Sequence, residues 1–194
     1  MTNRASSLAL LCLAALACTD TTVTGMGRAE AVIQDTPGTS PATGSSLAGN
    51  SSAAVSADGV TWVNLGSPNG ITVALQEAGT TTTVHGETGA PAGDYSRVRL
   101  VFSGVEARLL AGAVIGGVTL TSNVDLTLGG ADQEVVLTVS VPEFTIEDDP
   151  AVRRTIVFDL RSHLWLTSQA LQAGTVEDAA IQGAIQASTR LENR

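Results

Sequence analysis

The sequence predicts an all-β protein folded as an antiparallel sandwich or barrel. The main observation is a run from Pro91 to Leu109 in which apolar and polar side chains alternate, as in a strand with one buried face. Other alternating runs occur along the chain, separated by turn dipeptides such as Asp-Gly and Gly-Gly. Only 3% of the residues are aromatic and 15% are charged, which disfavours a long salt-bridged helix. Together these patterns favour many short strands around one core.

The stretch from Pro91 to Val105 is the central element of the predicted fold. At Ser103-Gly104 the alternation shifts by one residue, which is typical of a β-bulge. Beyond the shift, the apolar face continues as far as Leu109. Before it, the apolar face consists of Val98, Leu100 and Phe102, and the opposite face of Arg97, Arg99 and Val101.

Further strands are expected on both sides of this element. A first strand, Ala29 to Ile33, ends at Asp35-Thr36-Pro37, and residues 36–52, rich in Ser, Gly and Thr, are expected to form a low-complexity loop. Asp58-Gly59 between two β-prone runs predicts a hairpin. The remaining expected strands are residues 71–75 after a turn at Asn69-Gly70, 80–84, 118–128, 135–141 ended by Pro142, and 153–160.

The C-terminal part of the chain fits two structures. Residues 177–189 can form an amphipathic helix or a strand, and we expect a closing strand. The reasons are that Gly183 weakens a helix by about 1 kcal/mol, and that a sheet edge would otherwise lie open. A short helical turn is expected at Ser168 to Ala173. A single domain is therefore expected over residues 28–190.

The N-terminus carries a targeting signal. Residues 1–17 combine a basic start, an apolar stretch of about ten residues and small residues before Cys18, which is similar to a bacterial lipoprotein signal peptide. The alternative is an ordinary signal peptide cut near Ala17. Lipidation of Cys18 is favoured because Cys12, the other cysteine, is removed with the leader. Residues 18–27 are expected to be a flexible tether.

These features predict an exported protein that is anchored to a membrane through a lipid. It would lie in the periplasm or on the cell surface, at the outer membrane if the host is Gram-negative. The formal charge of -9 argues against nucleic acid as a partner, because no basic stripe is present to neutralise phosphates.

Three motifs occur in an order that resembles a known domain family. They are Asp35-Thr36-Pro37, the element Ala92-Gly93-Asp94-Tyr95-Ser96-Arg97-Val98-Arg99-Leu100, and Phe144-Thr145-Ile146 followed by Val157-Phe158-Asp159-Leu160. The chain resembles, over roughly residues 28–189, a family of unknown function found in exported bacterial and archaeal proteins, many of them lipoproteins. The resemblance implies an immunoglobulin-like or transthyretin-like sandwich and brings no established activity.

A few residues are candidates for specific roles. Tyr95 follows the turn residue Gly93 and is expected to bond back to a neighbouring loop, a structural role. Arg99 and Asp159 are also assigned structural roles. Trp62 and Trp165 form a possible ligand contact that stacks on sugar, and the alternative for both is packing in the core or at an edge.

No pattern for catalysis or metal binding is found. His85 and His163 lie far apart without cysteine, and the acidic turn Glu147-Asp148-Asp149 lacks the spacing and glycine of a calcium loop. No G-x-S-x-G or phosphate-binding motif is present. We therefore expect a non-catalytic cell-envelope protein without metal or cofactor, and as the alternative a surface binding module for glycan or protein ligands.

Overall fold

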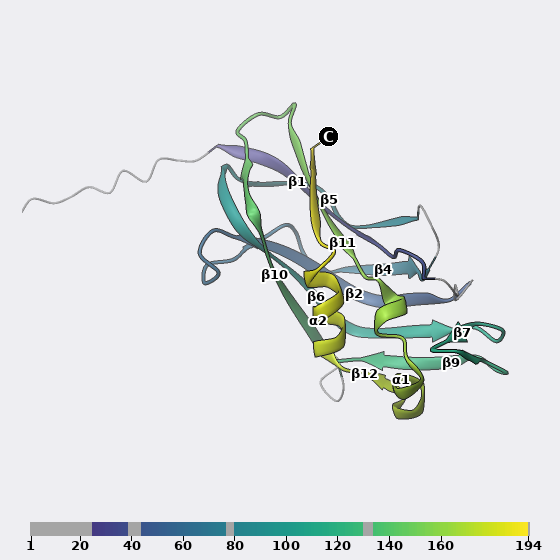
Figure 1. Ribbon diagram of the computed structural model, residues 1–194. Coiled ribbons are helices and arrows are strands. Elements are labelled where there is room, and N and C mark those ends of the chain that lie inside the picture. Colours follow the sequence, from purple (N-terminus) through teal and green to yellow (C-terminus); the bar gives the residue numbers. More distant parts are fainter. Residues whose placement is uncertain (1–24, 39–43, 77–79, 130–133, 194) are drawn as a thin grey trace, which may run out of the picture.

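The computed structural model describes residues 25–38, 44–76, 80–129 and 134–193. The expected signal peptide, Cys18 and most of the tether lie outside these residues. Figure 1 shows the arrangement of strands and helices. In chain order the elements are β1 Met26–Gln34, β2 Ser46–Ser56, β3 Val63–Asn64, β4 Asn69–Ala74, β5 Thr81–Pro91, β6 Gly93–Leu109, β7 Val114–Ile115, β8 Val118–Thr119, β9 Val124–Leu128, β10 Glu134–Ile146, β11 Arg153–Asp159, the 3-10 turn η2 Ser162–Leu164, α1 Ser168–Ala173, β12 Thr175–Val176, α2 Asp178–Gln186 and β13 Arg190–Asn193.

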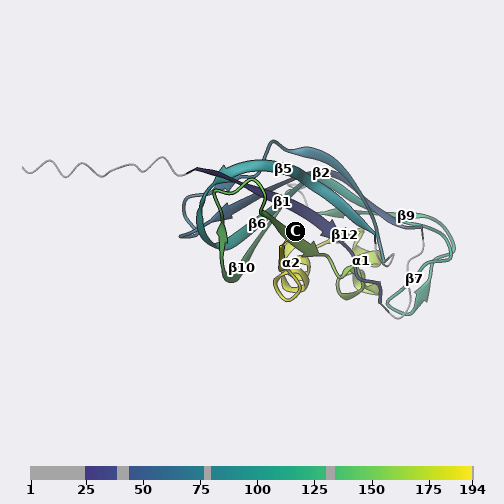
Figure 2. The ribbon, with the colours of Figure 1, turned by 90° about the horizontal axis from the view of Figure 1, so that it is seen from above.

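Two sheets form a sandwich, which confirms the expected fold class. The smaller sheet has the order β13-β11-β1-β5, and the larger has β12-β9-β6-β2-β3, with β10 also paired to β6 and β4 to β2. The sheets are not purely antiparallel as expected, because β1 pairs with β11 and β9 with β12 in parallel. In the view of Figure 2, α1 and α2 lie together on one side of the strands.

The predicted central strand is confirmed. Among the described elements β6 is the longest, and its inward-facing apolar residues are buried in the core: Val98, Leu100, Phe102, Val105, Ala107 and Leu109. The bulge is also confirmed, since Asn50 lies opposite Ser103 but Ala48 lies opposite Glu106. Gly104 takes a φ of +57°, a left-handed conformation that glycine adopts without strain.

Residues 46–52 correct the expectation of a loop, because they form the first part of β2. This strand lies between β6 and β4, so its backbone is paired on both sides. Its small side chains carry little hydrophobic signal, yet they allow a close fit: a Cβ on Gly49 would lie 2.7 Å from the carbonyl oxygen of Gly104. Strand pairing, rather than side-chain hydrophobicity, decides the structure here.

The C-terminal segment corrects a second expectation, because α2 is a helix and not a closing strand. Ile181, Ala184 and Ile185 are buried on its inner face, at the spacing of a helix that packs on a core. The sheet edge is closed in another way. The carboxamide of Gln182 accepts a hydrogen bond from the Thr138 N–H (3.0 Å) and donates one to the Thr138 carbonyl (2.7 Å). A side chain therefore occupies the free edge of β10 at this point.

Smaller differences concern strand boundaries. Pro142 does not end β10, because the strand resumes beyond an irregularity between Ser140 and Phe144. Asn69 and Gly70 begin β4 instead of forming a turn. The expected hairpin at Asp58-Gly59 is confirmed, with β2 and β3 paired antiparallel. Within the described ranges, none of the helices has the length and apolar character needed to cross a membrane.

Candidate functional site

Two buried carboxylates meet where β1 and β11 end. The two strands run parallel and Gln34 is paired with Asp159, so their carboxyl ends lie side by side. Asp35 follows β1 directly and Asp159 is the last residue of β11; their exposed fractions are 2% and 4%. Asp159 alternates with the apolar residues Ile156, Phe158 and Leu160, so alternation alone would place it on a solvent face. It is instead buried, because β11 is covered on both faces.

Asp35 is held by the turn that follows β11 and by the end of the β4 segment. Its carboxylate accepts hydrogen bonds from the Ser162 N–H (2.7 Å), from the Ser162 hydroxyl (2.5 Å) and from the Gln76 N–H (2.5 Å). Burial raises the pKa of Asp35 above its ordinary value, and the nearby charge of Asp159 adds to the rise, although the hydrogen bonds oppose it. The carboxylate joins three segments that are distant in sequence.

The Asp159 carboxylate accepts four hydrogen bonds from described residues. The donors are the Thr36 N–H (3.0 Å), the Thr36 hydroxyl (2.5 Å), the Gln34 carboxamide (2.9 Å) and the Arg161 N–H (3.3 Å). Arg190 adds an ion pair at 4.0 Å. Burial alone would raise the pKa of Asp159, but the hydrogen bonds from Thr36, Gln34 and Arg161 outweigh it, so the pKa lies below its ordinary value. The group is charged and nearly enclosed.

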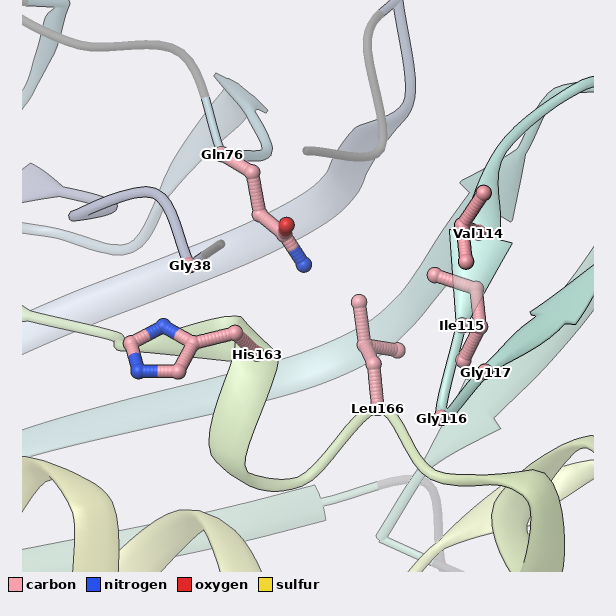
Figure 3. A pocket seen from close by; sticks show the side chains of 8 residues that line it. All are labelled: Gly38, Gln76, Val114, Ile115, Gly116, Gly117, His163 and Leu166. Carbon is pink, nitrogen blue, oxygen red and sulfur yellow. The ribbon is translucent and has the colours of Figure 1, made fainter. Parts of the chain in front are cut away.

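A pocket of about 200 Å³ opens beside these carboxylates. Figure 3 shows the carboxamide of Gln76 and the side chain of Leu166 directed into it, with His163 at one side. The imidazole Nδ1 lies 3.1 Å from the carbonyl oxygen of Thr36. No carboxylate is among the described residues that line it. The lining residues are Gly38, Gln76, Val114, Ile115, Gly116, Gly117, His163 and Leu166.

Tyr95 bonds back to the turn that precedes β6. The Tyr95 hydroxyl donates a hydrogen bond to the Pro91 carbonyl at 2.7 Å, across the turn that contains Gly93. The ring lies 5.9 Å from that of Phe144, centroid to centroid. Tyr95 is buried and therefore fixes the start of β6.

The two tryptophans do not form a shared surface. Trp165 has an exposed fraction of 2%, and its indole N–H donates to the Leu160 carbonyl at 2.9 Å. It borders a hollow of about 190 Å³ between α1 and the start of α2. Trp62 is half-buried on the outward face of the larger sheet, where the Arg99 guanidinium carbon lies 4.3 Å from its ring centroid. Arg99 is thus a stacking partner of the aromatic ring.

The remaining candidate metal ligands are the two histidines and the acidic turn. The side chain of His85 lies outside the described part of the chain, and His163 is half-buried. The turn at residues 147–149 is exposed, as expected. Among the residues that the structure describes, no three His, Cys, Asp or Glu side chains are placed to hold a metal ion.

The carboxylate cluster was not predicted, although both acids lie in the motifs quoted above. The missing information was the parallel pairing of β1 with β11, for which the sequence has no local signal. Comparison of the chain with protein-family models, curated proteins and solved structures finds no match.

Proposed function

We propose that this chain is a non-catalytic protein of the cell envelope, anchored by a lipid on Cys18, that acts by contact through the surface of its sandwich. The observation that carries this proposal is the state of the two buried carboxylates. All four carboxylate oxygens of Asp35 and Asp159 accept hydrogen bonds from the fold. An active site needs such groups free to face a substrate.

The carboxylate cluster supports a structural role instead. It ties the end of β1 to the end of β11, to the η2 turn and to Gln76. Removing a buried acceptor of this kind leaves donors without partners, which destabilises a fold by about 1–3 kcal/mol for each. The cluster therefore holds the sandwich closed, and function is left to the outer surface.

A surface binding module is the second candidate, and one observation favours it. Trp62 and Arg99 stack on each other on an outward sheet face rather than in the core. Exposed aromatic and arginine side chains are enriched where proteins bind ligands.

The proposed anchor would hold the domain close to the membrane. Eight residue steps separate Cys18 from Met26, where β1 begins. A fully extended chain spans at most about 3.5 Å for each residue, so the tether reaches about 28 Å. The sandwich would then act within a short distance of the bilayer.

The test is detergent-phase partitioning of the mature protein made in a bacterial host. We expect the unaltered protein in the detergent phase and Cys18→Ala in the aqueous phase. Cys12→Ala is the matched control, because this cysteine lies in the leader and its loss should leave partitioning unchanged. Equal partitioning of the unaltered protein and Cys18→Ala would contradict the anchor.

A further inference from the structure

The outward face of the larger sheet carries two arginines side by side. Arg97 and Arg99 lie two residues apart on β6, about 7 Å along the strand, with their side chains on the same face. Their register partners on β10 are Ser140 and Thr138. Both arginines are half-buried, so neither is extended freely into water.

Neither guanidinium has its charge neutralised within the described part of the chain. Among the residues that the structure describes, no carboxylate lies within ion-pair distance of Arg97 or Arg99. Other arginines do have such partners: Arg108 lies 3.9 Å from Asp125, Arg153 lies 3.6 Å from Glu30, and Arg190 lies 3.0 Å from Glu192. Arg97 donates one hydrogen bond, to the Ser140 hydroxyl at 2.7 Å. Two neighbouring positive charges repel each other, and an anion on this face would relieve that repulsion.

Arg99 is the more unusual of the two. Its Nε is buried and has no hydrogen-bond partner, and the side chain is positioned by stacking on Trp62. Buried donors of native proteins are normally paired, so an unpaired one requires an explanation. Stacking fixes the plane of the guanidinium without occupying its outer N–H groups. The terminal NH₂ groups of Arg99 form no hydrogen bond or ion pair with the residues that the structure describes.

The two arginines contrast with the acidic character of the whole protein. The formal charge is -9, and all ten basic residues are arginines. Arginine, unlike lysine, binds a carboxylate with two parallel hydrogen bonds. A pair of arginines without acidic partners on an acidic protein therefore forms a local site for an anion.

We propose that this Trp62–Arg97–Arg99 face binds an acidic polysaccharide, with sugar carboxylates held by the two guanidiniums. The inference deepens the proposed function, since it assumes a protein that acts by contact at the cell envelope. The surroundings favour sugar: Ser140 and Thr138 offer hydroxyl groups that can exchange hydrogen bonds with sugar hydroxyls. The indole supplies an apolar wall for a sugar ring.

A peptide is the less suitable partner for this face. Extended peptides bind sheets by adding a strand to a free edge. The arginines project from the face of β6, which is paired with β2 on one side and β10 on the other. The edge of β10 beyond them is itself occupied by Gln182 at Thr138. To a ligand on this face, β6 therefore offers side chains rather than an unpaired strand edge.

The test measures binding of the purified mature protein to polygalacturonate. Neutral dextran, dextran sulfate and poly-glutamate serve as comparison polymers, and the signal is quenching of tryptophan fluorescence, checked by affinity electrophoresis. We expect polygalacturonate to bind, with an affinity that falls as salt rises. Arg99→Gln and Arg97→Gln should each weaken binding by about tenfold or more, the ordinary effect of losing a charged hydrogen-bond pair. Trp62→Phe should remove most of the quenching, because Trp165 is buried.

Arg108→Gln is the matched control, because it removes the same charge from the same strand at a residue already paired with Asp125. The affinity of Arg108→Gln for polygalacturonate should stay within about twofold of that of the unaltered protein. Near-UV circular dichroism verifies that each variant is folded, and Arg97→Gln keeps the test valid if Arg99→Gln does not fold. Three outcomes would overturn the inference: no binding of polygalacturonate, equal losses in Arg108→Gln and Arg99→Gln, or tighter binding of poly-glutamate or dextran sulfate. None of these would affect the partitioning result for Cys18, so the two proposals fail separately.

Discussion

Replacing Asp159 by asparagine tests whether the carboxylate cluster holds the sandwich together. The substitution keeps the size of the side chain and removes its charge. In the native protein the carboxylate accepts hydrogen bonds from Gln34, from the N–H and hydroxyl of Thr36, and from the Arg161 N–H. It also lies 4.0 Å from Arg190. An asparagine has one acceptor oxygen in place of two.

The expected loss of unfolding free energy comes from hydrogen-bond donors that are fixed in place and cannot rotate to find another acceptor. If the new NH₂ group replaces Oδ1, it faces the backbone N–H groups of Thr36 and Arg161. If it replaces Oδ2, it faces the Gln34 carboxamide, which cannot flip freely because its oxygen accepts a hydrogen bond from Arg190 at 2.9 Å. Each buried donor left without a partner costs about 1–3 kcal/mol. We therefore expect the free energy of unfolding to fall by about 2–4 kcal/mol.

The pH dependence gives an independent check. The pKa of Asp159 is lower in the folded protein than in the unfolded chain. Its contribution to stability is therefore fully present above the unfolded pKa, near 3.9, and is lost as the pH falls through the folded pKa. The difference in unfolding free energy between the native protein and Asp159→Asn should therefore have its full size at pH 7 and become smaller below about pH 4.

Urea unfolding of the purified protein, followed by the fluorescence of buried Trp165, measures this difference at each pH. The matched control is Asp125→Asn, because Asp125 is exposed and forms only a loose ion pair with Arg108. Its expected effect is below about 0.5 kcal/mol. Two results would refute the structural role of the cluster. One is a loss of unfolding free energy for Asp159→Asn as small as that of the control. The other is a loss that does not change between pH 7 and pH 3.

Two other predictions concern the core and the sheet edge. Leu100→Ala and Phe158→Ala should each lower the free energy of unfolding by about 2–5 kcal/mol in urea titrations, because both side chains are buried. Val101→Ala, on the opposite face of β6, should lower it clearly less. Equal losses of unfolding free energy at positions 100 and 101 would contradict the assigned faces. Gln182→Ala should free the N–H and carbonyl of Thr138 at the edge of β10, so light scattering should detect more self-association than in the native protein. Unchanged self-association would show that the edge of β10 does not need the Gln182 side chain.

The central strand could be predicted because its signal is local. Alternation over β6 places Leu100 inside and Arg99 outside without reference to any other segment. The same method fails for β2, where Gly49 and its small neighbours give no hydrophobic period. Their strand conformation depends on β6 and β4 on either side.

The helix α2 replaces the expected strand because packing on the core outweighs the weak helix preference of Gly183. Gly183 does weaken a helix, but it is exposed on the outer side, while Ile181 and Ile185 are buried on the inner side. The carboxylate cluster could not be foreseen for a different reason. Gln34 and Asp159 are 125 residues apart, and only the parallel pairing of β1 and β11 brings them together.

The position of β1 also determines when the protein can complete its fold. This strand is made first, yet it lies in the interior of its sheet, between residues 81–91 of β5 and residues 153–159 of β11. Both neighbours are synthesised much later, so β1 has no partner within its own part of the chain. Pairings between such distant segments form slowly, because a long loop must close before any contact is gained. A chain interrupted before residue 153 would leave one side of β1 open to other molecules, so the smaller sheet cannot be completed until β11 has been synthesised.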